Sequence, residues 1–357
     1  NDQVMLWAPA TMDAASIGPF QNRVMQITVV AGSVITVGTD LAAAFPAYTV
    51  GANTLVDCVV YEIATYVTSW TTAMLPKLRL VQADEGLANG QGTAVILSHD
   101  VAPQKLSVTT VADGPVDAIL ALAAVSFVDG PYLDQQGTFE VPETGTVSAY
   151  TGSITFTPLT TAFVAADVGR HIRLFSQPAA WAIGTTYAYG DSVTYKKEYW
   201  TSVLASNLGV YPGTTKSVSG VETTYWVPAI DPQQWAWGTI TAQAGATCTV
   251  GLVTSLNSAN GATIAAWQLG VYKAGQYPTC GLYIGGRLGL SGALPNRIDW
   301  SMSNRPFTFS PTDATGLVAD NNAISGVLNS TTLNDIYWMK PDHQGILFGT
   351  ASGEWSW

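Results

Sequence analysis

The stretch Ser153-Ile154-Thr155-Phe156-Thr157 decides the fold class, because polar and apolar side chains alternate along it. Alternation with a period of two puts every second side chain on one face, which is the pattern of a half-buried β-strand. Similar short runs at 24–30, 93–97 and 345–349 are closed by Gly, Asn, Asp or Pro turns. Regular short strands of this kind are typical of sandwiches, barrels or propeller blades, so the sequence predicts a mainly β protein. Helical periodicity is scarce, and only 69–75 and 165–169 are short helix candidates.

The composition narrows the function classes. The chain has 357 residues, of which 11% are charged and 47% are hydrophobic. Charged residues usually make up about 25%, and a chain this apolar is not intrinsically disordered. No run of about 18 uncharged apolar residues predicts a membrane-spanning helix. The net charge of −11 argues against a basic surface that grips nucleic acid, although it leaves room for nucleic acid that slides past.

Cysteine and histidine are too few for a metal or disulfide framework. The cysteines Cys58, Cys248 and Cys280 are far apart and odd in number, and the chain has only three histidines. We therefore expect no disulfide scaffold, no metal site and no cofactor. The sequence starts at Asn1 without Met and ends at Trp357 inside a strand-like run, so we expect a fragment of a longer chain.

The segment 179–232 is dense in aromatic residues and is expected to be a module of its own. Sugars stack their flat CH faces on such rings, but a small β unit also needs aromatic side chains for its core. We expect Trp181, Tyr199 and Trp226 in the core, because they fall in strand-like runs. The expected sugar-binding residues are Tyr189 and Tyr211, which lie beside turns, and Trp200, which should face away from Tyr199 on a strand.

Candidate catalytic groups have simpler structural interpretations. Asp191 and Glu198 could serve as the carboxylate pair of a glycosidase. Gly190-Asp191 is a turn, however, and Glu198 follows two lysines in an expected hairpin loop. His99 is interpreted as a turn residue after an apolar strand, and neither a nucleophile elbow nor a phosphate-binding loop is present. We therefore predict no catalytic residue and no enzyme activity.

Three arginines near the C-terminus could line a subunit contact or meet phosphates. These are Arg287, Arg297 and Arg305. The favoured interpretation is that each pairs with a nearby carboxylate such as Asp299 or Asp313.

A series of motifs in order gives a family resemblance. Upstream segments are Tyr61-Glu62-Ile63-Ala64-Thr65, then 75–84, 97–106, Phe127-Val128-Asp129-Gly130-Pro131-Tyr132-Leu133 and 163–174. Downstream segments are 275–279, 286–288, 291–292, Ile298-Asp299-Trp300-Ser301, 307–310, 320–324, 328–330, 334–338 and 347–355. This order resembles the tail nozzle (tail hub or tail tubular) proteins of short-tailed bacteriophages. Residues 1–55 match that family poorly, and Tyr66 stands where the family has Pro.

The resemblance implies a fold with a β-barrel or sandwich platform, a β-propeller-like region and a small β carbohydrate-binding-like insertion. The expected domains are a platform at 1–178, an inserted module at 179–232 and an incomplete propeller-like region at 233–357. It also implies a virion protein of the tail that forms a ring of six copies. Its partners would be the tail adaptor and a distal spike, fibre or needle, with genome DNA passing through the lumen without sequence-specific contact.

The segment 179–232 also resembles small carbohydrate-binding modules of the chitin-binding kind. The matching residues are Ala180-Trp181, 186–187, 189–195, Tyr199-Trp200, Pro212-Gly213 and Tyr225-Trp226. Many chitin binders carry adjacent exposed aromatic residues where this chain has Val203-Leu204, which weakens a chitin assignment. Two alternatives to the nozzle remain open: a host-adhesion protein that binds a surface glycan, and a tail glycosidase.

Overall fold

The computed structural model divides the chain into two units, Asn1–Ser69 and Trp70–Trp357. It describes residues 3–7, 24–31, 34–37, 59–63, 68–83, 93–110, 118–138, 140–229, 234–257, 261–330, 332–343 and 345–357. The described strands of the first unit form an antiparallel sheet in the order β3-β2-β1-β4. Their bounds are Gln3–Trp7 (β1), Val24–Ala31 (β2), Val34–Val37 (β3) and Val59–Ile63 (β4). Cys58 lies outside the described residues.

The prediction of a mainly β protein is confirmed. Among the described residues, the regular structure is strand apart from single 3₁₀ turns at Leu75–Lys77 and Ala165–Asp167, which overlap the two helix candidates. No helix in the described part of the chain is long and apolar enough to cross a membrane.

The second unit begins with a four-stranded antiparallel sheet in sequential order. Its strands are Arg79–Ala83 (β5), Thr93–Leu97 (β6), Gln104–Thr110 (β7) and Ala118–Ala124 (β8). On β6, alternate residues are buried, as the sequence predicts, and Val95 and Leu97 are fully enclosed.

A closed six-stranded barrel follows, in the order β10-β20-β19-β11-β21-β9. Ile154 and Phe156 point into its core beside Trp267, while Ser153 and Thr155 are exposed, so the alternating stretch forms the strand it predicts. Position 145 needs glycine, because the Phe156 ring occupies the space that a Cβ would take. The barrel strands are Gly145–Val147 (β9), Ser153–Pro158 (β10), His171–Ser176 (β11), Gln234–Ala244 (β19), Thr247–Leu252 (β20) and Thr263–Leu269 (β21).

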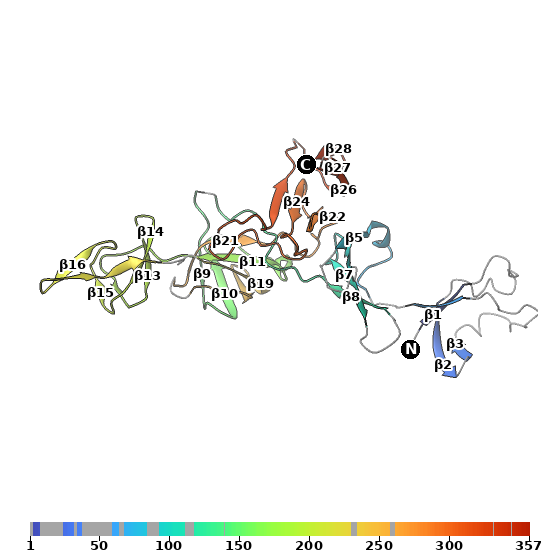
Figure 1. The fold of residues 1–357 in the computed structure, drawn as a ribbon, viewed down its shortest axis with the longest axis horizontal. Coiled ribbons are helices and arrows are strands. Elements are labelled where there is room, and N and C mark those ends of the chain that lie inside the picture. Colours follow the sequence, from blue (N-terminus) through green and yellow to red (C-terminus); the bar gives the residue numbers. More distant parts are fainter. Residues whose placement is uncertain are drawn as a thin grey trace, which may run out of the picture. The chain divides into compact units, whose positions relative to one another are not determined.

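The aromatic-rich segment lies between two neighbouring barrel strands. β11 pairs with β19, and their last matched residues are Ser176 and Gln234, so the segment replaces the loop that would join them (Figure 1). Strands β19 to β21 fall in the range 233–357 that the sequence assigns to the propeller-like region. They close the barrel instead, because β11 needs antiparallel neighbours on both sides to complete its hydrogen bonds.

The inserted segment has a core of its own, and we call residues 179–229 the module. Tyr187, Val193, Val210 and Trp226 are buried together, and the Trp226 indole donates to the Val210 carbonyl at 2.8 Å. Its short strands are Thr186–Tyr187 (β12), Ser192–Tyr195 (β13), Glu198–Ser202 (β14), Asn207–Leu208 (β15), Thr215–Val218 (β16), Val221–Thr224 (β17) and Trp226–Pro228 (β18).

Burial in the module corrects one expectation about its core. Trp226 is buried and Trp181 packs half-buried against the core, as expected. On β14, however, Trp200 packs against this core, and half-buried Tyr199 does not. Adjacent strand residues do face opposite sides, but the alternation alone does not say which side is covered.

Two further antiparallel sheets follow the barrel. The first is ordered β22-β23-β24-β25, with bounds Cys280–Ile284, Arg287–Ser291, Arg297–Trp300 and Ile324–Val327. The second is ordered β26-β27-β28, with bounds Ile336–Asp342, Gly345–Thr350 and Gly353–Ser356.

The first strand of the middle sheet contacts the first strands of the other two sequential sheets. β22 lies close to both β5 and β26. Leu288 and Leu290 share a buried cluster with the β5–β8 sheet, whereas Ile298 and Trp300 share one with the β26–β28 sheet. The β22–β25 sheet is therefore covered on both faces. Gly289 allows the Trp300 ring to lie flat across the sheet, since a Cβ there would clash with the ring.

Candidate functional site

A buried network of polar side chains connects the barrel to the segments before and after it. Asp129 and Arg173 are its centre: both are buried, and Arg173 Nε lies 3.7 Å from Asp129 Oδ1. The Tyr132 hydroxyl donates to the same carboxylate oxygen at 2.8 Å. Burial and the neighbouring Asp129 raise the pKa of Tyr132 well above its ordinary value, so this hydroxyl remains a donor. We call this network the joint.

Arg173 ties a distant loop into the joint. Its Nη2 donates to the carbonyl oxygens of Thr312 at 3.2 Å and Asp313 at 3.1 Å. Its guanidinium also lies 4.8 Å from the centre of the Trp235 ring, within the range of a cation–π contact. One side chain therefore connects β11, β19 and the 312–313 loop.

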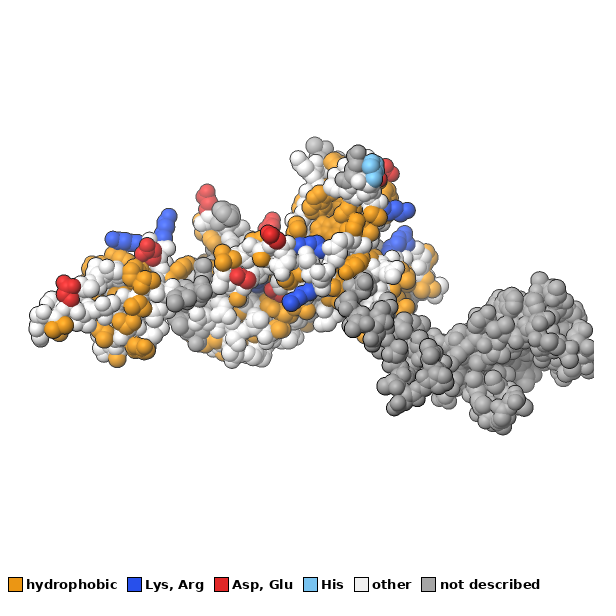
Figure 2. Space-filling view, viewed as in Figure 1, with side chains coloured by type: hydrophobic (Ala, Val, Ile, Leu, Met, Phe, Trp, Pro, Cys, Tyr) orange, Lys and Arg blue, Asp and Glu red, His pale blue; other side chains and the backbone are white. Residues whose placement is uncertain are grey.

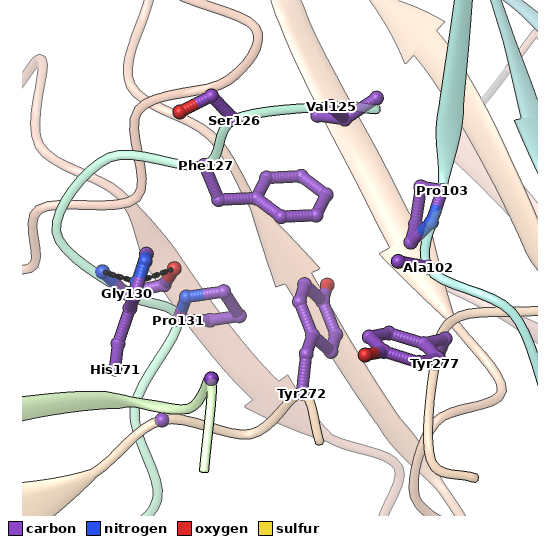
Figure 3. Close-up of a pocket in the computed structure, with 12 residues that line it drawn as sticks. Ala102, Pro103, Val125, Ser126, Phe127, Gly130, Pro131, His171, Tyr272 and Tyr277 are labelled. Carbon is purple, nitrogen blue, oxygen red and sulfur yellow. Dashed lines mark hydrogen bonds between the residues drawn. The ribbon is translucent and has the colours of Figure 1, made fainter. Parts of the chain in front are cut away.

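His171 lies at the edge of the joint, beside a cavity of about 220 Å³ (Figure 3). Its Nδ1 lies 3.1 Å from the Gly130 carbonyl oxygen and 3.3 Å from the Gly130 nitrogen. Burial lowers the pKa of His171, and the bond to Gly130 and the charge of Asp129 oppose that shift. Figure 3 shows the Phe127, Tyr272 and Tyr277 rings around the same cavity.

Two further arginines extend the joint. Arg170 Nη1 donates to Asp167 at 2.7 Å, and its Nε donates to the Gly270 carbonyl. Arg297 Nη2 donates to Asp299 at 2.9 Å and also to the Tyr132 carbonyl oxygen. The charged side chains of the joint thus come mainly from 127–133, 163–174 and 297–301, which are far apart in sequence.

The three C-terminal arginines were expected to pair with carboxylates. The structure gives each of them a different environment. Arg297 pairs with Asp299, as predicted. Arg287 instead donates to the carbonyl oxygens of Ser301 at 2.6 Å, Asn322 at 2.7 Å and Asp320 at 2.9 Å, so the prediction is wrong for this residue. Its neighbours there are loop backbone groups that need donors. Arg305 is exposed.

On the module, three aromatic rings meet at the surface. Trp181 lies 4.5 Å from Tyr211 and 5.5 Å from Tyr195, and the two tyrosine rings are 6.0 Å apart, measured between ring centres. Tyr211 is 44% exposed. We call this surface, together with the adjacent Trp200, the aromatic face.

The aromatic face borders an open hollow of about 540 Å³. Gly213 leaves room for Trp200, because a Cβ at position 213 would lie 3.1 Å from the indole. Residues lining the hollow are Tyr195, Lys196, Glu198, Trp200, Tyr211, Pro212, Gly213 and Thr214. Planar rings beside hydroxyl and charged groups can stack against a sugar and hydrogen-bond to its substituents.

The structure brings together two of the three residues expected to bind sugar. Trp200 and Tyr211 line the same hollow, whereas Tyr189 is 73% exposed and does not line it. Sequence reasoning missed Tyr195 and Lys196. The sequence did contain a signal for them. The expected hairpin loop before Glu198 places Tyr195 and Lys196 at the end of a strand pair.

Two of the candidate catalytic groups, Asp191 and His99, have structural partners. The Asp191 carboxylate accepts the Ala188 N–H at 2.6 Å and so closes a turn, and Glu198 is the first residue after the β13–β14 hairpin loop. His99 follows β6, where its Nδ1 lies 2.9 Å from Asp100, as expected of a turn residue.

The described thiols are buried as well. Cys248 and Cys280 are free, and burial raises the pKa of each to about 12. Within the described ranges, no group of three or more His, Cys, Asp or Glu side chains could hold a metal ion.

Fold and site together define a mainly β protein with a six-stranded barrel, sequential antiparallel sheets and an inserted aromatic module. No family model and no curated protein matches the chain.

Proposed function

We propose that this chain is a structural component of a short bacteriophage tail, where six copies form the nozzle ring. In this role it continues the channel for DNA ejection and anchors the distal parts of the tail. It would contact the tail adaptor above and a spike, fibre or needle protein below. It has no catalytic task in this proposal.

The observation that supports this function is the convergence of resemblance motifs at the joint. Segments 127–133, 163–174 and 298–301 carry part of the nozzle resemblance. The Arg173–Asp129 ion pair joins the first two segments, and Arg297, which directly precedes the third, donates to a backbone carbonyl oxygen of the first. Motifs that share a buried network are expected to occur together in one fold. These charged groups stabilise the fold through partners inside the protein. A virion component that must withstand mechanical force needs such stabilisation.

The three sequential sheets support a propeller-like region. In a propeller, each blade is an antiparallel meander, and the first strands of successive blades lie next to one another. β5, β22 and β26 have this relation, and each begins a meander. We propose that the three sheets are successive blades.

The charge of the chain suits a conduit. A basic lumen would bind the phosphate backbone and slow the passage of DNA. The chain has only 14 Lys and Arg residues against 25 Asp and Glu. Figure 2 shows few charged side chains on the visible described surface, where orange and white prevail.

The aromatic face favours a second candidate function, namely contact with a host-surface glycan. The rings of Trp181, Tyr195 and Tyr211 form a cluster beside an open hollow, and these residues belong to an insertion that the barrel does not need for closure. In a tail, the module would be an outward host contact, so the two functions are compatible.

Cryo-electron microscopy of the particle that carries this chain tests the proposal. We expect a sixfold ring at the distal tail with residues 179–232 projecting away from the lumen. A free monomer or a trimeric spike would contradict the nozzle function and favour adhesion alone. Density for DNA against the module would contradict its outward placement.

A further inference from the structure

The hairpin that borders the hollow has an unusual turn. Tyr195 and Glu198 are the last matched pair of β13 and β14, so Lys196 and Lys197 form a two-residue loop. Both lysines have positive φ, 52° and 67°. Two-residue loops of this type favour Asn-Gly, because residues with a Cβ are strained in the left-handed region.

The position of these lysines at the hollow accounts for the strained turn. Lys196 lines the hollow, and its Nζ lies 5.3 Å from the centre of the Tyr195 ring. Lys197 is exposed beside it. Strained backbone is concentrated at binding sites, where the side chain matters more than the stability of the turn. Asn-Gly would make a better turn but would carry no charge.

The end of the hairpin carries a positive excess, because Lys196 and Lys197 lie beside one carboxylate, that of Glu198. Of these groups, Lys196 and Glu198 line the hollow, and Lys197 lies next to it. The whole chain carries −11, so a local positive excess is uncommon in it. Figure 2 shows basic side chains together near the β13–β14 hairpin.

We propose that the hollow binds an acidic glycan, a chain of pyranose sugars that carry carboxylate groups. The pyranose rings stack on Tyr211 and Trp200, and the ammonium groups of Lys196 and Lys197 pair with the sugar carboxylates. Polymers of glycerol phosphate or ribitol phosphate lack flat pyranose faces, so they would use the charge but not the rings. The inference rests on the second candidate function, glycan contact by the module.

The test compares oligo-uronates with their carboxyl-reduced forms. The probes are hexamers of galacturonate, mannuronate and a glucuronate-containing repeat, each paired with the neutral sugar of the same length. Binding to the full chain is measured by calorimetry at low salt. We expect at least one acidic hexamer to bind about tenfold more tightly than its neutral form, and this difference to shrink in high salt.

Variants assign the selectivity to the hairpin. The double variant Lys196→Asn, Lys197→Gly keeps the turn and removes both charges, so it should lose the preference for acidic sugar while its melting temperature stays level or rises. Glu198→Gln should tighten acidic binding about two- to fivefold, since it removes a repelling charge. Lys216→Gln, on β16, removes a lysine of the same module that does not line the hollow and should change neither affinity.

The possible outcomes separate the two proposals. Equal binding of acidic and neutral hexamers would overturn the acidic preference and leave glycan contact intact. Absence of binding to every hexamer, acidic or neutral, would overturn both. Unchanged acidic preference in the Asn-Gly variant would also overturn the role of the hairpin.

Discussion

The joint and the aromatic face use the same residue types in opposite ways. In the joint, Arg173 is 3% exposed and Tyr132 donates to a buried carboxylate, so the charged and hydroxyl groups there have partners within the protein. On the aromatic face, Tyr211 is 44% exposed and Lys196 and Lys197 lie at the surface. Buried groups with internal partners hold a fold, whereas exposed rings and charges remain available to a ligand. The difference separates architecture from recognition within one chain.

Breaking the joint should give the largest effect on stability. Arg173→Met leaves the Asp129 carboxylate buried without its cation and leaves two loop carbonyls without their donor. Removing one partner of a buried ion pair costs about 3–5 kcal/mol. We expect a loss of that size in the free energy of unfolding, measured by urea denaturation.

A second variant tests whether the cost comes from the unpaired charge. Adding Asp129→Asn to Arg173→Met should recover part of the loss, because the remaining buried group is then neutral. Lys216→Met, at an exposed strand position, is the control and should stay within about 0.5 kcal/mol of the wild type. A loss below about 1 kcal/mol in Arg173→Met would contradict a stabilising role of the joint for the 312–313 loop.

The strands of this protein were predictable, and the joint was not. Alternation at 153–157 identifies both the strand and its inward residues, Ile154 and Phe156, since a period of two is a local property. Asp129 and Arg173 are 44 positions apart, and no local pattern says that they meet. The prediction for Arg287 failed for the same reason: its partners are backbone carbonyls, and these carry no sequence signal.

The aromatic face was predictable in part. The density of rings in 179–232 indicates the module, and Trp200 and Tyr211 were named as sugar-binding candidates. Which rings are covered depends on which face of β14 meets the module core, and that is decided by contacts such as Trp226 with Val210 that lie far along the chain. The sequence therefore locates the module but not the hollow.

Acidification should weaken the joint and leave the aromatic face unaffected. Burial lowers the pKa of His171 below that of the unfolded chain, about 6.5. Below that pH the unfolded chain binds a proton that the folded protein resists, so stability falls as pH falls. Between pH 7.5 and 5.5 we expect the free energy of unfolding to fall, and one titrating group can account for at most about 1.4 kcal/mol of that fall.

His171→Asn should flatten this dependence, because the amide can still bond to Gly130 but does not titrate in this range. The lowered pKa of Glu143, which comes from bonds donated by Thr160 and Thr161 against the effect of burial, acts in a separate window below about pH 4.5. A slope in the His171→Asn variant equal to that of the wild type would assign the effect to other groups.

Alanine variants of two tyrosines in the module should differ little in the free energy of unfolding. They should differ most in their affinity for sugar. Tyr189 is 73% exposed and lies outside the hollow, so Tyr189→Ala should change neither the free energy of unfolding nor affinity for a uronate hexamer. Tyr211→Ala loses the ring contact with Trp181 at 4.5 Å and should cost about 1 kcal/mol. It should also weaken sugar binding, which the same calorimetry measures. Equal loss of affinity in both variants would indicate that the sugar contacts much of the module surface. Loss in Tyr211→Ala alone would indicate that the sugar binds in the hollow.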